Sequence, residues 1–65
     1  MKYQLADLNN GVFGEVFYNL EDAELALAEA IAEGQAENNA HADEYEQAGL
    51  PVPQAEDFLS IVEVE

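Results

Sequence analysis

The feature that most constrains the fold is the dipeptide Asn10-Gly11, which lies between two short runs rich in aromatic and β-branched residues, KYQLADL and VFGEVFY. Asn and Gly tolerate the positive φ angles of a type I′ turn, so the pattern predicts a β-hairpin. With Asn10 and Gly11 as a two-residue loop, Leu5 would face Val16. One face of the hairpin would then carry Tyr3, Leu5, Val16 and Tyr18, and the other Leu8, Phe13 and Phe17.

A helix is predicted to begin at about Leu20, directly after the second strand. Asn19 is a good N-cap, and Glu21 and Asp22 fall in the first turn, where the helix dipole favours acids. The 3.6-residue period places Leu20, Ala23, Leu27, Ala30 and Ile31 on one side. We expect the opposite, solvent-facing side to carry Asp22, Glu29, Glu33 and Glu37.

The second half of this helix has weak helix formers at Gly34, Asn38 and Asn39. An unbroken helix would also align Gly34, Asn38 and His41 with the apolar side. The sequence therefore predicts a break or kink between Gly34 and Asn39 and a second helix over about 40–48, followed by Gly49 as its C-cap.

The C-terminal part predicts a stiff connection and a third strand. Pro51 and Pro53 cannot continue a helix, and FLSIVEV then places Phe58, Val62 and Val64 on one strand face. The order ββααβ indicates an α+β fold, in which one or two helices pack on one face of a small antiparallel sheet made from the N-terminal hairpin and the C-terminal strand. We expect residues 1–65 to form a single acidic α+β domain.

Charge restricts the possible partners. Fifteen Asp and Glu residues stand against a single Lys, giving a formal net charge of −14. Nucleic acid and anionic lipid would repel such a chain, so we expect no direct binding to nucleic acid or membrane, and a basic protein as partner. No apolar run approaches the roughly 20 residues of a membrane span, which predicts a cytoplasmic protein. The apolar hairpin face of Leu8, Phe13 and Phe17 makes a homodimer possible.

Few residues are suited to catalysis. The chain has no Cys, Thr, Trp or Arg, and Ser60 and His41 are the only residues of their types. The acidic cluster DEYE at 43–46 lacks the Asp/Asn ladder and central Gly of a calcium loop. We expect no enzyme activity, no cofactor and no metal site, and we retain a minimal enzyme or metal binder only as a third hypothesis.

The acids are arranged in a way that stability does not favour. Glu29, Glu33 and Glu37 follow one another at four-residue spacing, and each like-charge pair at that spacing costs about 0.2–0.5 kcal/mol. One interpretation is that they substitute for phosphates and bind a basic groove. The predicted partner-binding surface comprises Asp22, Glu24, Glu29, Glu33, Glu37, Asp43, Glu44 and Glu46. The alternative is that the acids serve only solubility, as in halophile proteins.

In size, acidity and lack of cysteine the chain resembles the small phage-encoded anti-CRISPR proteins that act as DNA mimics. That resemblance implies a partner, the DNA-binding channel of a CRISPR effector such as a Cascade-type surveillance complex, in the cytoplasm of the host cell. A second, partial resemblance lies in NNGVFGEVFYNLEDAELALAEAIAEG and GLPVPQAEDFLSIVEVE, which are similar to the HicB-like antitoxin domain. It implies an antitoxin that neutralises a small basic ribonuclease toxin.

Overall fold

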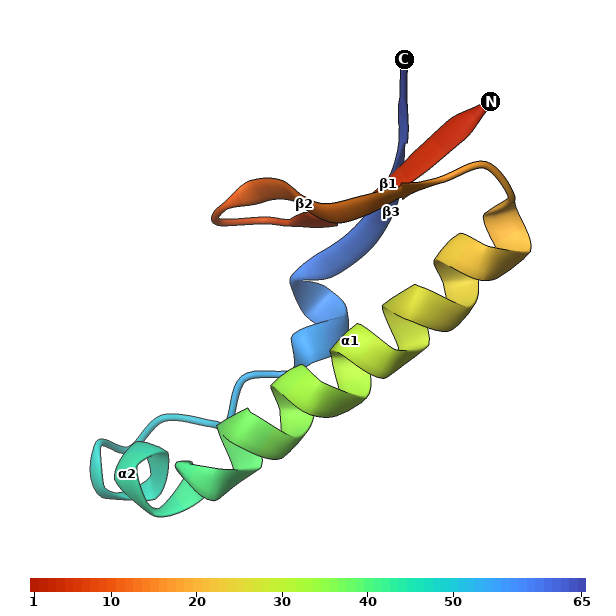
Figure 1. Ribbon diagram of the computed structural model, residues 1–65. Coiled ribbons are helices and arrows are strands. Elements are labelled where there is room, and N and C mark those ends of the chain that lie inside the picture. Colours follow the sequence, from red (N-terminus) through yellow and green to blue (C-terminus); the bar gives the residue numbers. More distant parts are fainter.

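The computed structural model describes residues 1–65 as a three-stranded antiparallel sheet with a long helix lying across one of its faces (Figure 1). The strand order is β2-β1-β3. In chain order the elements are β1 (Lys2–Asp7), β2 (Gly11–Phe17), α1 (Leu20–Ala40), α2 (Ala42–Gln47), the 3-10 turn η1 (Ala55–Asp57) and β3 (Leu59–Val64). The predicted α+β class and the order ββααβ are confirmed.

The hairpin forms, but the predicted two-residue turn is wrong. The loop has three residues, Leu8 to Asn10, and Gly11 opens β2 at φ +82°. The Asn9 N–H donates to Asp7 Oδ1 over 2.8 Å, which stabilises the start of this loop. The left-handed residue follows this loop directly, and Gly adopts that conformation at no steric cost.

The longer loop and a bulge in β2 change the register of the hairpin. Leu5 pairs with Phe13 rather than Val16, and Tyr3 pairs with Phe17. Between these pairs Gly14, Glu15 and Val16 lie opposite Gln4 alone, and Gln4 Nε2 donates to the Gly14 carbonyl over 2.9 Å. Cross-strand partners share a face, so Phe13 and Phe17 lie on the same face as Leu5. The two predicted faces are therefore wrong.

The homodimer face expected from Leu8, Phe13 and Phe17 consequently does not form. Leu8 lies in the loop and is exposed, whereas Phe13 and Phe17 face the same way as the buried Leu5. Of the residues predicted to share a face of the third strand, Val62 and Val64 do so, opposite Gln4 and Lys2 on the face turned away from α1. Phe58 precedes that strand.

Only three residues are buried: Leu5 on β1, Ala23 on α1 and Ala55 in η1. Ala23 is fully buried because its small side chain lets α1 come close to the sheet. Leu27, Ala30 and Ile31 are half-buried around it, as the helical period predicts. Leu20, assigned to the same side, is 45% exposed because it stands at the first position of the helix.

The predicted break between Gly34 and Asn39 is wrong, because α1 continues to Ala40 and ends only at His41. The polar residues in this half contact the return segment, residues 50–57, instead of an apolar core. Gln35 Oε1 accepts from the Ala55 N–H over 2.8 Å, and Asn38 Nδ2 donates to the Pro53 carbonyl over 3.1 Å. A Cβ on Gly34 would lie 3.3 Å from Ala55 Cβ, so only Gly permits this close approach without rearrangement.

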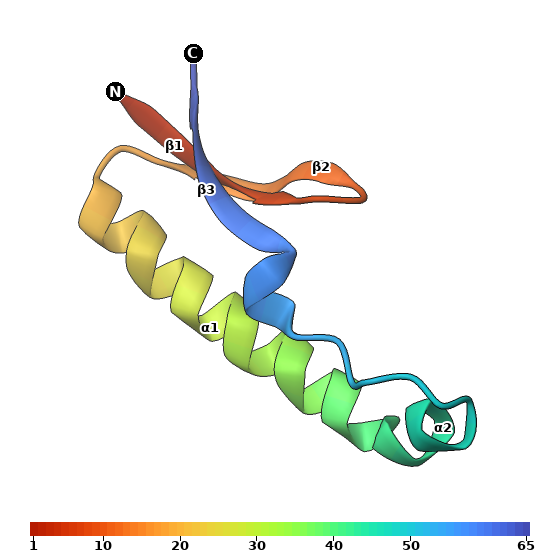
Figure 2. The same ribbon diagram turned by 180° about the vertical axis from the view of Figure 1, so that it is seen from behind.

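The molecule is elongated, with extents of 45 × 19 × 14 Å. Both views show the second half of α1 and all of α2 extending beyond the sheet, while both termini lie at the opposite end (Figures 1 and 2). The Cα radius of gyration is 13.7 Å, against about 11 Å expected for a compact chain of this length. No helix has both the length and the apolarity needed to cross a membrane.

Candidate functional site

The eight predicted partner-binding acids are all exposed. Those on α1 are Asp22, Glu24, Glu29, Glu33 and Glu37, and those on α2 are Asp43, Glu44 and Glu46. Lys2, the single basic residue apart from His41, lies at the start of β1 and makes no ion pair. The only contact of this kind joins His41 Nδ1 to Glu44 Oε2 at 3.3 Å, and both side chains are more than half exposed. The acids on α1 therefore have no counter-charge within the protein.

The sequence predicts that Glu29, Glu33 and Glu37 all lie on the side opposite the apolar residues. In the structure the row does not stay on that side. Four residues of an α-helix turn through about 400°, so each step of the row moves about 40° around the axis. Over two steps the row winds toward the sheet. Glu33 and Glu37 consequently line the same hollow as Ala30 and Gly34, although both remain exposed.

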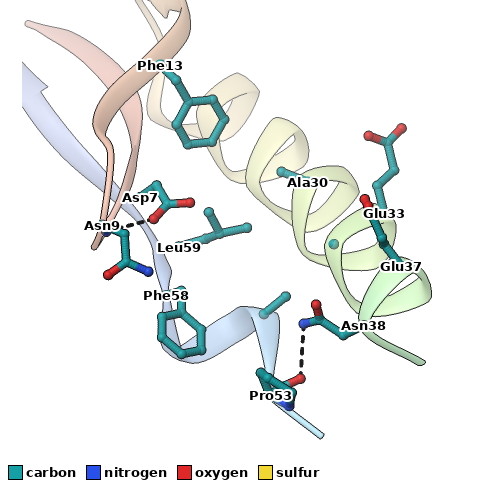
Figure 3. A pocket seen from close by; sticks show the side chains of 12 residues that line it. Asp7, Asn9, Phe13, Ala30, Glu33, Glu37, Asn38, Pro53, Phe58 and Leu59 are labelled. Atoms are coloured by element: carbon teal, nitrogen blue, oxygen red, sulfur yellow. Dashed lines mark hydrogen bonds between the residues drawn. The ribbon is translucent and has the colours of Figure 1, made fainter. Parts of the chain in front are cut away.

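This hollow lies between α1, the hairpin and the return segment, and its volume is about 560 Å³. Its apolar lining includes Phe13, Phe58 and Leu59, and its acids are Asp7, Glu33 and Glu37. Figure 3 shows Asp7, Phe13 and Leu59 extending from the strands toward α1, with Glu33 and Glu37 on the helix side. The Asn38–Pro53 and Asp7–Asn9 hydrogen bonds fix two parts of its border (Figure 3).

Another hollow, smaller and more open, lies earlier along α1, between this helix and β2. It is lined by Glu15 and Phe17 of β2 and by Asp22, Leu25, Ala26 and Glu29 of α1. The two hollows share no lining residue and follow one another along α1, over residues 22–29 and 30–38, and we name them together the acid-lined groove. Carboxylates stand on both of its sides, Asp7 and Glu15 on the hairpin and four of the predicted acids on α1.

The structure thus divides the predicted residues into two groups. Asp22, Glu29, Glu33 and Glu37 border the acid-lined groove. Glu24 and the three acids of α2 do not line it. Sequence reasoning missed Asp7 and Glu15, and the position of Glu15 beside α1 depends on the hairpin register and the bulge. Asp7, two residues after Leu5, would have been placed on the helix side by the alternation of β1 alone.

No group of three or more His, Asp or Glu side chains is arranged to hold a metal ion. The chemistry that this surface offers is the binding of cations by exposed carboxylates beside apolar side chains. Comparison with known protein families, with curated proteins and with solved structures finds no match to this chain.

Proposed function

We propose that this protein is a non-enzymatic inhibitor that binds the basic nucleic-acid-binding surface of another protein and places carboxylates where phosphates would lie. The observation that carries the proposal is the row of exposed acids on α1 with no basic residue near it. Uncompensated carboxylates on one helix repel each other and attract cations, so their arrangement lowers stability and favours a basic partner.

The dimensions of the row suit this role. From Asp22 to Glu37 the helix rises about 22 Å, which corresponds to about six to seven base-pair steps of B-form DNA. Acids four residues apart are about 6 Å apart along the axis, sparser than the phosphates of one strand, at about 3.4 Å. Asp7 and Glu15 add charge on the other side of the groove. Two acidic sides match the two strands of a duplex better than one row does.

The resemblance to DNA-mimicking anti-CRISPR proteins gives the proposal its specific partner. We assign the protein to the host cytoplasm, where it would occupy the DNA-binding channel of a CRISPR effector such as a Cascade-type surveillance complex. Lys and Arg side chains that normally bind phosphate would bind the carboxylates of α1.

The second candidate is a HicB-like antitoxin that neutralises a small basic ribonuclease toxin. It is favoured by the arrangement of the hairpin, α1 and β3 as one sheet-and-helix unit, reached through the Gly49–Pro53 connection that carries the resemblance. The two candidates differ in what is inhibited, DNA binding by an effector complex in one case and RNA cleavage by a single small enzyme in the other.

The test replaces Glu29, Glu33 and Glu37 together by Gln. DNA binding by a purified Cascade-type complex is followed by fluorescence anisotropy as wild-type or variant protein is added. Wild type should displace DNA, and the triple variant should not, with a shallower dependence of effector binding on salt. The variant should melt at an equal or higher temperature, because two like-charge pairs worth about 0.4–1 kcal/mol in total are relieved.

A matched control replaces Asp43, Glu44 and Glu46 by Asn, Gln and Gln. It removes the same number of charges from α2, away from the acid-lined groove. Equal loss in both variants would show that only net charge matters. Full inhibition by the triple α1 variant would show that its glutamates do not substitute for phosphates.

A further inference from the structure

The acid-lined groove has an apolar lining that charge mimicry alone does not require. Phe13 is 37% exposed and Leu25 is 66% exposed, although both are large apolar residues beside hollows. A surface that bound phosphate-binding side chains only through charge would need no exposed Phe or Leu between the carboxylates. These side chains indicate that the partner also contributes apolar groups.

Charge decides between the possible occupants. A second copy of this chain would bring another net charge of −14, with no Arg and one Lys, against acids on both sides of the groove. A partner with Lys or Arg beside an apolar stripe has the complementary pattern. Its alkyl stems would lie on Phe13 and Phe17 while its charged ends reach the carboxylates.

The form of the occupant follows from the strand that borders the groove. An added β-strand would need an uninterrupted edge, but β2 is broken by the bulge at Gly14 to Val16. An α-helix needs no backbone partners and presents apolar side chains at positions i, i+3, i+4 and i+7.

We propose that the acid-lined groove binds an amphipathic α-helix of the partner, with its apolar stripe on Phe13, Phe17 and Leu25 and with Lys or Arg residues on both flanks. This inference rests on the proposed function, because it names the partner element that the acidic surface recognises. It adds a second requirement, since binding should depend on apolar contact as well as on charge.

The probe for this proposal is a synthetic 18-residue peptide of Leu and Lys, with Leu at helical spacing on one side. A scrambled peptide of identical composition serves as its control, because it keeps the charge and removes the stripe. Each is titrated into the ¹⁵N-labelled full chain while backbone amide shifts are recorded. The patterned peptide should bind at least about tenfold more tightly than the scrambled one, a difference equal to the burial of about one Leu side chain. The largest shifts should fall in β2 and residues 22–37.

The variant is Leu25→Gln, which lies on an exposed helix position and preserves helix propensity. It should weaken patterned-peptide binding about fivefold to tenfold. Leu50→Gln, at a residue 59% exposed in the return segment, should leave binding unchanged. Circular dichroism on both variants confirms that the fold is kept.

Three results would overturn the proposal: equal binding of the two peptides, shifts centred on α2 or on the face of Val62 and Val64, or concentration-dependent shifts without peptide, which would identify a second copy as the occupant. The two proposals fail separately. If the triple Gln variant loses inhibition but Leu25→Gln inhibits the effector fully, charge mimicry stands and the helix-binding groove does not.

Discussion

Gln35 holds the return segment against α1, and its replacement by Met should lower stability markedly. The Gln35 side chain accepts the Ala55 N–H over 2.8 Å, and Ala55 is only 5% exposed. Met has nearly the same length and helix propensity but offers only a weak acceptor, so a buried donor is left without a good partner. That loss costs about 1–3 kcal/mol.

The effect is large relative to the stability available. A domain of this length has about 3–10 kcal/mol of unfolding free energy in total. At about 4–8 °C per kcal/mol, a loss of about 2 kcal/mol lowers Tm by about 8–16 °C. Thermal unfolding followed by circular dichroism at 222 nm measures this shift, and hydrogen exchange should show the Ala55 amide losing its protection.

Gln47→Met is the matched control, because Gln47 is exposed on α2 and makes no side-chain hydrogen bond. It should change the free energy of unfolding by no more than about 0.5 kcal/mol. If Gln35→Met melts within about 3 °C of wild type, a shift below the smallest expected here, the contact between α1 and the return segment contributes little. Our explanation for the unbroken helix would then be wrong.

Two further substitutions test the packing and capping of α1 by the same melting measurement. Gly34→Leu should cost about 1–3 kcal/mol by overpacking against Ala55, whereas Ala36→Leu on the exposed side should be close to neutral; equal Tm values for the two would disprove the close approach. Asn19→Ala should cost about 1 kcal/mol, because Asn19 Oδ1 accepts the Glu21 N–H over 2.8 Å, and an unchanged Tm would show that this cap does not stabilise the helix.

The elements of the fold were predictable where the signal is local. The Asn19 cap, the acids after it and the apolar period of α1 lie within one stretch of sequence, and the helix begins where they predict. The hairpin was predictable for the same reason, but its register was not. Asn10-Gly11 fits both a two-residue and a three-residue loop. The three-residue loop occurs together with the hydrogen bond from the Asn9 N–H to Asp7 and with the bulge at Gly14.

The continuity of α1 was not predictable because its partners are distant in sequence. Gln35 bonds Ala55 and Asn38 bonds Pro53, contacts that span 20 and 15 residues. Read within its own helix, Asn38 is a polar group on an apolar side. Beside the return segment it is a half-buried hydrogen-bond donor to the Pro53 carbonyl. The exposure of the acids followed from their charge, whereas the groove follows from the tertiary arrangement of hairpin and helix.

The sizes of the buried and exposed side chains differ from what stability alone would favour. Two of the three buried positions are Ala, and the closest approach of α1 to η1 uses Gly34. Phe13 and Leu25, which would contribute far more free energy if buried, remain partly exposed beside carboxylates. A chain selected for stability alone would bury the large side chains and disperse the acids. Under the proposed function, large apolar residues and acids together on the outside would leave hydrophobic free energy to be gained on binding the partner.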